Sequence, residues 1–319
     1  MPSEFDLIRR HFTRPTRHTD LAGGDDAALL RARPGMQLAV STDMLVAGTH
    51  FFADTDPEDL GWKTLAVNVS DLAAMGATPR WAFLALALPG ADEAWIAPFA
   101  SGLFACADVH GVDLAGGDTT RGPLTLSVTI VGEVAQGRAI TRGGGRAGDD
   151  LWVSGQPGMA ALGLAALRGE AALTPAGRAA CVAALQRPQP RVALGLALHG
   201  VASAMLDVSD GLLGDLGHIL ECSATGATLE LAALPLDALL HAGADPTLAQ
   251  RCLLAGGDDY ELLFAAPAAR RDAVADIGTR LGLALHRIGT LTDSPGALRL
   301  RTRDGELVPA TCSGYDHFG

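Results

Sequence analysis

The strongest constraint on the fold is a Gly-Gly-Asp triplet that occurs three times beside apolar runs. Gly-Gly-Asp-Asp stands at residues 23–26 and again at residues 256–259, and Gly-Gly-Asp stands at residues 116–118. The run at 256–259 leads directly into Tyr-Glu-Leu-Leu-Phe, which is typical of a buried strand. The chain therefore has to place several negative charges at the ends of apolar elements, where an unpaired carboxylate is costly.

Strand-like and helix-like segments alternate along the chain, which favours an α/β fold of the α+β sandwich type. At 319 residues the chain is too long for one ordinary core, so we expect two domains. The first half should hold helices at 56–75 and 92–109 and strands at 36–42, 81–88 and 124–134. The second half should hold helices at 157–168, 175–186, 190–199 and 211–223, and strands at 204–208 and near residues 228, 262, 286 and 298.

Residues 141–150 are the segment richest in helix and strand breakers, and they mark the expected domain boundary. We predict an N-terminal domain with a mixed sheet and helices over residues 1–145 and a C-terminal α/β domain over residues 146–319. Phe5, Ile8 and Phe12 fall at helical spacing and predict an amphipathic first helix.

Charge and cysteine usage exclude several classes of function. A formal net charge of −12 opposes binding to nucleic acid or to an anionic lipid surface, both of which attract basic patches. No apolar stretch approaches the roughly 18 residues of a membrane span. The five cysteines form no C-x-x-C pair, and no export signal is visible, so we expect structural thiols in a reducing cytoplasm.

Eight aspartates share one context, because each lies within or at the end of an apolar element, usually beside Gly, Ser or Thr. A single aspartate of this kind is more often a turn former or a helix cap. As a set these carboxylates would repel one another unless a cation lay between them, and magnesium prefers such oxygen ligands, including the hydroxyls of Ser41 and Thr42. The eight are Asp26, Asp43, Asp71, Asp118, Asp207, Asp210, Asp258 and Asp259.

Glycines and arginines near these aspartates favour contacts with phosphate groups. Gly116 and Gly117 and the triple glycine at 143–145 can bring backbone N–H groups close to phosphate oxygens, with Arg121 and Arg142 nearby. The alternative for the triple glycine is a flexible linker. Neither a P-loop motif nor the protein-kinase motifs occur, so a nucleotide site here has to be of another kind.

Seven blocks of sequence, in order and spread over nearly the whole chain, resemble one family. They are GDDAALL (24–30), STDMLVAGTHF (41–51), AVNVSDLAAMGATP (66–79), GGDTTRGP (116–123), DVSDGL (207–212), GGDDYELLF (256–264) and GYDHF (314–318). This pattern is similar to that of the thiamine-monophosphate kinases, in the superfamily that includes aminoimidazole ribonucleotide synthetase.

The resemblance implies a homodimer formed through the N-terminal domain, and transfer of the ATP γ-phosphoryl group to thiamine monophosphate with several Mg²⁺ ions. Because the acceptor is a phosphate with a second pKa of about 6, no general base is needed, and the main obstacle is repulsion between two polyanions. The implied metal ligands are Asp26, Ser41, Thr42, Asp43, Asp71, Asp118, Asp207 and Asp210. Among them Asp43, Asp71, Asp118 and Asp210 are the implied catalytic carboxylates.

The same resemblance assigns the remaining contacts. Gly117, Asp118, Arg142 and Ser209 match nucleotide contacts, and His50, Asp258 and Tyr315 match contacts with thiamine monophosphate. Asp258 stands where the family usually has Glu, one methylene longer, which puts a direct contact from this side chain in question. Gly23 replaces a larger apolar residue that is common before the first Gly-Asp-Asp.

Other interpretations of the sequence remain open. A superfamily relative could use ATP to activate a different substrate, and an acidic protein could bind metal without catalysis. A reactive cysteine near the N-terminus would favour selenophosphate synthetase, but the first cysteine is Cys106. A C-terminal cysteine would favour the hydrogenase-maturation relatives, but Cys312 is followed by seven residues. His50 alone is readable as a structural histidine, and Tyr315 alone as a core aromatic.

Overall fold

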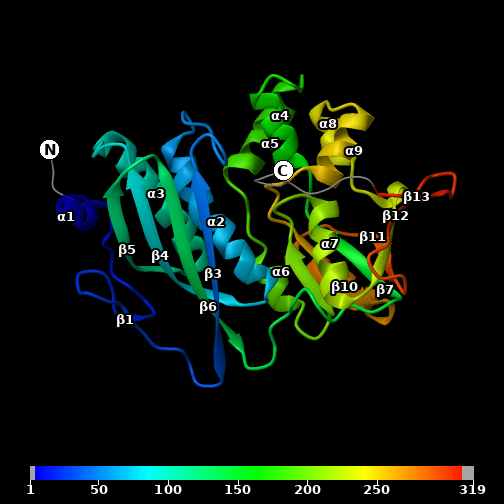
Figure 1. The fold of residues 1–319 in the computed structure, drawn as a ribbon, viewed down its shortest axis with the longest axis horizontal. Coiled ribbons are helices and arrows are strands. Elements are labelled where there is room, and N and C mark those ends of the chain that lie inside the picture. The colour runs from blue at the N-terminus through cyan, green and yellow to red at the C-terminus, as the bar shows by residue number, and fades with distance from the viewer. Residues whose placement is uncertain (1–3, 311–319) are drawn as a thin grey trace. The chain divides into compact units, whose positions relative to one another are not determined.

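A computed structural model describes residues 4–310 and divides the chain into two compact units (Figure 1). Unit 1 consists of Met1–Leu72 and Ala77–Arg138, and unit 2 consists of Ala73–Gly76 and Ala139–Gly319. The division precedes the glycine-rich segment at 141–150, which belongs to unit 2. Each unit combines a sheet with helices, which confirms the predicted α/β fold class.

Unit 1 holds, within the described residues, a four-stranded sheet in the order β3-β6-β4-β5. The strands are β3 (Met36–Val46), β6 (Thr125–Ala135), β4 (Thr78–Leu88) and β5 (Asp113–Arg121). Strand β3 pairs antiparallel with β6, which pairs antiparallel with β4, and β5 lies parallel to β4. Strand β5 was absent from the sequence prediction, because its Gly-Gly-Asp centre does not resemble a strand.

Helices α2 (Pro57–Ala74) and α3 (Glu93–His110) cover one face of this sheet. Asp56 accepts backbone hydrogen bonds from Glu58 and Asp59, so α2 begins where the Asp-Pro pair predicted. The helices approach through glycines, since a Cβ on Gly61 would lie 2.0 Å from the Phe99 carbonyl oxygen. Nearly every residue of α2 is buried, so this helix belongs to the core of its unit.

The N-terminal segment differs from the predicted amphipathic helix. Helix α1 (Glu4–Leu7) continues as a π-helical turn (Ile8–Phe12) and is followed by the short strands β1 (Thr19–Leu21) and β2 (Leu29–Leu30). Phe5 is 70% exposed, whereas Leu7 is buried. The apolar face predicted from Phe5, Ile8 and Phe12 is therefore wrong at Phe5, because the wider π-helical turn breaks the 3.6-residue period.

Unit 2 holds, within the part of the chain described, a seven-stranded sheet in the order β13-β12-β9-β11-β7-β10-β8. Its strands are β7 (Asp149–Ser154), β8 (Ala204–Asp207), β9 (Gly226–Glu230), β10 (Leu262–Pro267), β11 (Leu285–Thr292), β12 (Leu298–Arg301) and β13 (Leu307–Pro309). Its helices are α4 (Met159–Leu167), α5 (Pro175–Gln186), α6 (Val192–Ala197), α7 (Leu212–Ser223), α8 (Asp237–Ala242), α9 (Pro246–Ala255) and α10 (Arg271–Leu281). Short 3₁₀ turns lie at Leu231–Ala233 and Ala268–Arg270.

The unit 2 sheet lies between two apolar cores. Alternate residues of β10 enter different cores, with Leu263 and Ala265 in one and Leu262 and Phe264 in the other. This two-residue period explains why the Leu-Leu-Phe run is apolar without interruption. The run is a buried strand, as the sequence predicted. No helix among residues 4–310 is long and apolar enough to cross a membrane.

Candidate functional site

In unit 1, strand β3 and helix α2 bring three predicted site residues together. The Ser41 hydroxyl donates a hydrogen bond to Asp71 Oδ2 at 2.5 Å, and the Asp43 backbone N–H donates to Asn68 Oδ1 at 3.2 Å. Side chains at positions 41, 43 and 45 share one face of β3, and Leu45 is buried on that face. Ser41, Asp43 and Asp71 therefore lie on the side of the sheet that α2 covers.

Thr42 and Asp118 lie on the opposite face. The Thr42 hydroxyl shares a hydrogen bond with the Thr129 hydroxyl at 2.8 Å. Asp118 on β5 is in register with Ala85, Ser127 and Met44, and it is exposed. The Ser41 and Thr42 hydroxyls therefore do not lie together, because neighbouring residues of a strand point to opposite faces, and the assignment of both to magnesium stays a prediction.

Two buried carboxylates hold the segment that carries Asp26. Asp113 accepts hydrogen bonds from the backbone N–H groups of Arg17 and His18, and Glu133 accepts from Arg33 and Arg80. Burial raises the pKa of Glu133, but its bonds to Arg33 and Arg80 outweigh burial and leave that pKa lowered. Asp26 itself lies in the exposed turn between β1 and β2.

In unit 2, two aspartate-bearing loops run side by side as a continuation of the β8–β10 pairing. Beyond the pair Asp207 and Leu262, the Tyr260 N–H donates to the Val208 carbonyl and the Asp258 N–H to the Ser209 carbonyl, both at 2.8 Å. Glycine is required at position 257, because the Cβ of any other residue there would lie 2.2 Å from the Ser209 carbonyl oxygen. The structure thus brings the segment of Asp207 and Asp210 next to that of Asp258.

Asp258 adopts a left-handed backbone conformation, with φ of 69°. Aspartate tolerates this region better than glutamate does, because its short side chain can make local hydrogen bonds. The Tyr260 hydroxyl donates to Asp258 Oδ1 at 3.0 Å, and Tyr260 is itself at φ of 52°. The shorter side chain at position 258 therefore suits this turn.

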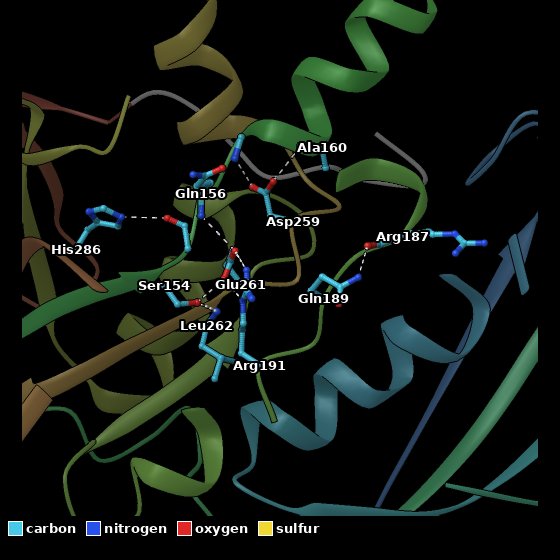
Figure 2. A network of polar contacts seen from close by, with 12 residues as sticks. Ser154, Gln156, Ala160, Arg187, Gln189, Arg191, Asp259, Glu261, Leu262 and His286 are labelled. Carbon is cyan, nitrogen blue, oxygen red and sulfur yellow. Dashed lines mark hydrogen bonds and ion pairs between the residues drawn. The ribbon is translucent and has the colours of Figure 1, made fainter. Parts of the chain in front are cut away.

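The other acidic residues of the 256–261 loop have structural contacts. Figure 2 shows Asp259 turned toward α4, where its carboxylate accepts from the backbone of Gly158 at 2.6 Å and of Ala160 at 3.4 Å. Burial raises the pKa of Asp259 well above its usual range. We placed Asp259 among the metal-binding aspartates from its sequence context, but the structure shows it capping a helix that has no side-chain cap of its own.

Glu261 lies at the centre of the network in Figure 2. It accepts two hydrogen bonds from Arg191, at 2.7 and 2.5 Å, and one from the Ser154 hydroxyl at 2.5 Å. The Gln156 N–H donates to the same carboxylate at 3.2 Å. This ion pair ties the end of β7 and the start of α6 to the start of β10.

Asp215 was missed by sequence reasoning. It lies in the first turn of α7, is 4% exposed, and accepts hydrogen bonds from the backbone N–H groups of Ser209, Asp210 and Gly211. Burial raises its pKa to about 6. Its spacing after the Asp-Gly-Leu block was the available signal, but a first-turn acid is common in helices.

The remaining predicted residues divide between the two units. The Val46 N–H donates to His50 Nδ1 at 3.0 Å, which fixes the orientation of the ring. The Arg142 carbonyl accepts a hydrogen bond from the Ser223 hydroxyl, and Gly144, at φ of 121°, lies against Ser203. The triple glycine is therefore a packed segment rather than a linker.

Gly117 allows close pairing of β5 with β4, since a Cβ at this position would lie 1.9 Å from the Leu84 carbonyl oxygen. Tyr315 lies outside the described residues.

The donor atoms suit magnesium bound together with substrate phosphates. Within residues 4–310, no group of three or more His, Cys, Asp or Glu side chains is arranged so that it could hold a metal ion by itself. Mg²⁺ is usually bound by one or two carboxylates with waters and phosphate oxygens rather than by a cage made only of protein ligands. Asp71 and Ser41 in unit 1, and Asp207 and Asp210 in unit 2, offer hard oxygen donors of this kind.

Comparison with known proteins gives full-length matches. The family described as AIR synthase related protein matches with its N-terminal domain at residues 24–134 and with its C-terminal domain at residues 146–300. Thiamine-monophosphate kinase of Escherichia coli (strain K12) is 46% identical over 320 residues, covering 99% of this chain and 98% of the relative.

Two solved structures are similar over nearly the whole chain. Thiamine-monophosphate kinase from Stenotrophomonas maltophilia K279a is 47% identical, with a TM-score of 0.85 and coverage of 95% of each chain. A structure described as "AaThiL complexed with AMPPCP and TMP" is 29% identical, with a TM-score of 0.79 and coverage of 98% of this chain and 96% of that one.

Proposed function

The chain belongs to the thiamine-monophosphate kinase family, and we propose that it transfers the γ-phosphoryl group of ATP directly to the phosphate of thiamine monophosphate. Its activity is ATP-dependent phosphorylation of thiamine monophosphate to thiamine diphosphate. Neither a relative that activates another substrate nor a non-catalytic metal-binding protein is favoured, since the kinase likeness extends over nearly the full length.

The observation that carries the proposed mechanism is the pair of joined loops in unit 2. The loop of Asp207 and Asp210, which we assign to metal, is hydrogen-bonded through Ser209 to the loop of Asp258, which we assign to thiamine monophosphate. Backbone bonds of this kind hold the two groups in fixed relative positions.

Each unit supplies oxygen ligands for magnesium in this proposal. Bound Mg²⁺ would neutralise the charge of the two phosphate-bearing substrates, which otherwise repel each other. In unit 1 the proposed ligands are Asp26, Ser41, Thr42, Asp43, Asp71 and Asp118, of which Thr42 and Asp118 lie on the sheet face opposite Ser41, Asp43 and Asp71. In unit 2 the ligands are Asp207 and Asp210.

The protein's own groups orient the substrates. Gly117, Asp118, Arg142 and Ser209 are the proposed nucleotide contacts. His50, whose ring is oriented by the Val46 N–H, and Asp258 are the proposed contacts with thiamine monophosphate. The Asp258 carboxylate would place a negative charge beside the cationic thiazolium ring. The acceptor oxygen of thiamine monophosphate is already largely ionised, with a second pKa of about 6, so no residue is assigned to remove a proton.

We also propose that the active form is a homodimer in the cytoplasm. Strand β3 exposes Leu38, Val40 and Met44 on the face opposite α2, with exposed fractions of 49%, 62% and 57%. A second copy of this face would remove that apolar surface from water. The cysteines at 106, 181, 222 and 252 are free thiols, as a reducing compartment requires. Val40→Glu should yield monomers by sedimentation analysis, and an unchanged association state would contradict the dimer face.

Acceptor choice and metal dependence test the mechanism together. With ATP and Mg²⁺, thiamine monophosphate should be phosphorylated and free thiamine should not, because no base is assigned to activate a neutral hydroxyl. Excess EDTA should stop turnover. Comparable rates with free thiamine, or full turnover in EDTA, would contradict the proposed mechanism.

A further inference from the structure

The loop at residues 208–211 is folded around a buried carboxylate. Asp215 Oδ2 accepts hydrogen bonds from the N–H groups of Ser209 at 3.0 Å, Asp210 at 3.0 Å and Gly211 at 3.1 Å. Three successive amides directed at one oxygen form the kind of concave nest that often binds an external anion. In this chain the anion is its own carboxylate, so these three amides are not available to a nucleotide phosphate.

The remaining backbone groups of this loop also make contacts within unit 2. The Val208 N–H donates to the Glu261 carbonyl, and the carbonyls of Val208 and Ser209 accept from Tyr260 and Asp258, all at 2.8 Å. Gly211 has φ of 114°, and a Cβ there would lie 2.9 Å from the carbonyl carbon of Ala255. The loop is therefore held on both sides. The groups that it can offer to a ligand are the half-buried side chains of Ser209 and Asp210.

Asp215 differs from an ordinary helix cap. A capping side chain satisfies N–H groups of the first turn of its own helix. The three N–H groups that donate to Asp215 Oδ2 all precede Leu212, where α7 begins. The contact thus orders the loop ahead of the helix rather than the helix itself.

We propose that Asp215 is a positioning residue for phosphoryl transfer, which fixes the Ser209–Gly211 backbone so that the Asp210 carboxylate and the Ser209 hydroxyl face magnesium and nucleotide. This inference rests on the proposed function, which assigns those roles to Asp210 and Ser209. Asp215 acts through the loop and touches neither substrate nor metal. Removing a residue that orients a metal ligand in this way typically lowers metal affinity or activity by about 10- to 100-fold.

The test compares Asp215→Ala and Asp215→Asn with a matched control, Asp245→Ala. Asp245 is also a carboxylate that accepts backbone N–H groups, from Thr247 at 2.9 Å and Leu248 at 3.0 Å, but it caps α9. Hydrogen–deuterium exchange of the full-length protein without nucleotide reports the amides at 209–211. Calorimetry with AMPPCP and Mg²⁺, together with kcat and KM for both substrates, reports the consequence for function.

We expect the amides at 209–211 to exchange slowly in the original protein and at least about tenfold faster in Asp215→Ala. AMPPCP affinity in the presence of Mg²⁺, and kcat, should each fall by at least about tenfold in that variant. Asp215→Asn should stay within about threefold of the original values, because its amide oxygen can still accept the three bonds. Asp245→Ala should lower the melting temperature without changing exchange at 209–211 or ligand affinity.

Several results would overturn the proposal. One is rapid exchange at 209–211 in the original protein, which needs no variant to measure. Another is an Asp215→Ala protein whose loop is unprotected but whose AMPPCP affinity and kcat are unchanged. If Asp215→Ala does not fold, a loss of more than about tenfold in Asp215→Asn with the amides still protected also counts against it. Normal turnover in Asp210→Asn would instead contradict the proposed function, so the two failures are distinguishable.

Discussion

Replacing Asp71 by asparagine separates a metal-binding carboxylate from a structural one. Asp71 is half-buried on α2, and Ser41 donates a 2.5 Å hydrogen bond to its Oδ2. Sequence reasoning alone predicts that Asp71→Asn leaves the metal-free fold equally stable or slightly more stable, since it removes repulsion between carboxylates. The structure adds an opposing effect, because Ser41 then donates to a neutral acceptor.

The size of that effect follows from the hydrogen bond. Bonds to a charged group contribute roughly 1.5–3 kcal/mol and neutral ones roughly 0.5–1.5 kcal/mol, so the exchange costs about 1 kcal/mol before the relief of repulsion is counted. We therefore expect the free energy of unfolding of Asp71→Asn in EDTA to change by less than about 1 kcal/mol. Turnover should fall by at least about a hundredfold, which corresponds to roughly 2.7 kcal/mol of lost transition-state stabilisation.

Thermal melts in EDTA and the assay of thiamine diphosphate formation measure the two quantities. Asp92→Ala is a suitable control in the same unit, because Asp92 caps α3 through the Ala94 N–H and its loss should cost about 1 kcal/mol while turnover is kept. An Asp71→Asn protein that melts markedly lower than the Asp92→Ala control yet turns over normally would show that Asp71 is structural. The magnesium ligands of unit 1 would then be wrongly assigned.

Three further changes test other parts of the structure. Asp258→Glu should shift KM for thiamine monophosphate by less than about tenfold, and Asp258→Ala should raise it more. The Glu variant should also melt slightly lower, because φ at this position is 69°. An unchanged KM in the Ala variant would rule out a substrate contact. Gly155→Ala should lower the free energy of unfolding by about 2 kcal/mol or more in urea titrations, because φ at Gly155 is 63° and the new methyl group would meet the Glu261 carboxylate. An unchanged free energy of unfolding would mean that the Glu261 side chain moves aside at no cost. Burial raises the pKa of Asp150, but its ion pairs with Arg271 and Arg287 outweigh burial and leave that pKa lowered. The carboxylate therefore stabilises the fold above the ordinary pKa of about 4, and this stabilisation is lost as pH falls through the lowered pKa. Arg271→Gln should flatten the fall in melting temperature in that acid range, and an unchanged pH profile would contradict the assignment.

The sequence predicted best those elements whose signals are local. The Asp-Pro start of α2 and the Thr-Pro start of α5 each combine a cap with a proline at the first helical position, and α5 spans Pro175–Gln186 as predicted. Strand β10 is apolar on both faces and was equally clear. Strand β5 was missed because its two glycines serve close pairing with β4, a contact made by residues far away in the sequence.

The candidate site was predicted as a set of residue types rather than as a geometry. The sequence singled out Ser41, Asp71, Asp207 and Asp210, and the structure places Ser41 against Asp71. The sequence did not indicate that Asp259 caps α4 or that Asp113 and Glu133 hold the N-terminal segment. In each of these cases the partner is a backbone N–H about 100 residues away, and no local pattern encodes such a contact.

An isotope experiment shows whether the γ-phosphoryl group of ATP is transferred to the phosphate of thiamine monophosphate. ATP carrying ¹⁸O at the three non-bridging oxygens of its γ-phosphate is incubated with thiamine monophosphate, Mg²⁺ and the protein, and the products are identified by mass. We expect all three heavy oxygens to arrive in the terminal phosphate of thiamine diphosphate, with one ADP formed for each thiamine diphosphate. Heavy oxygen released as inorganic phosphate without thiamine diphosphate, or formation of AMP and pyrophosphate, would contradict it.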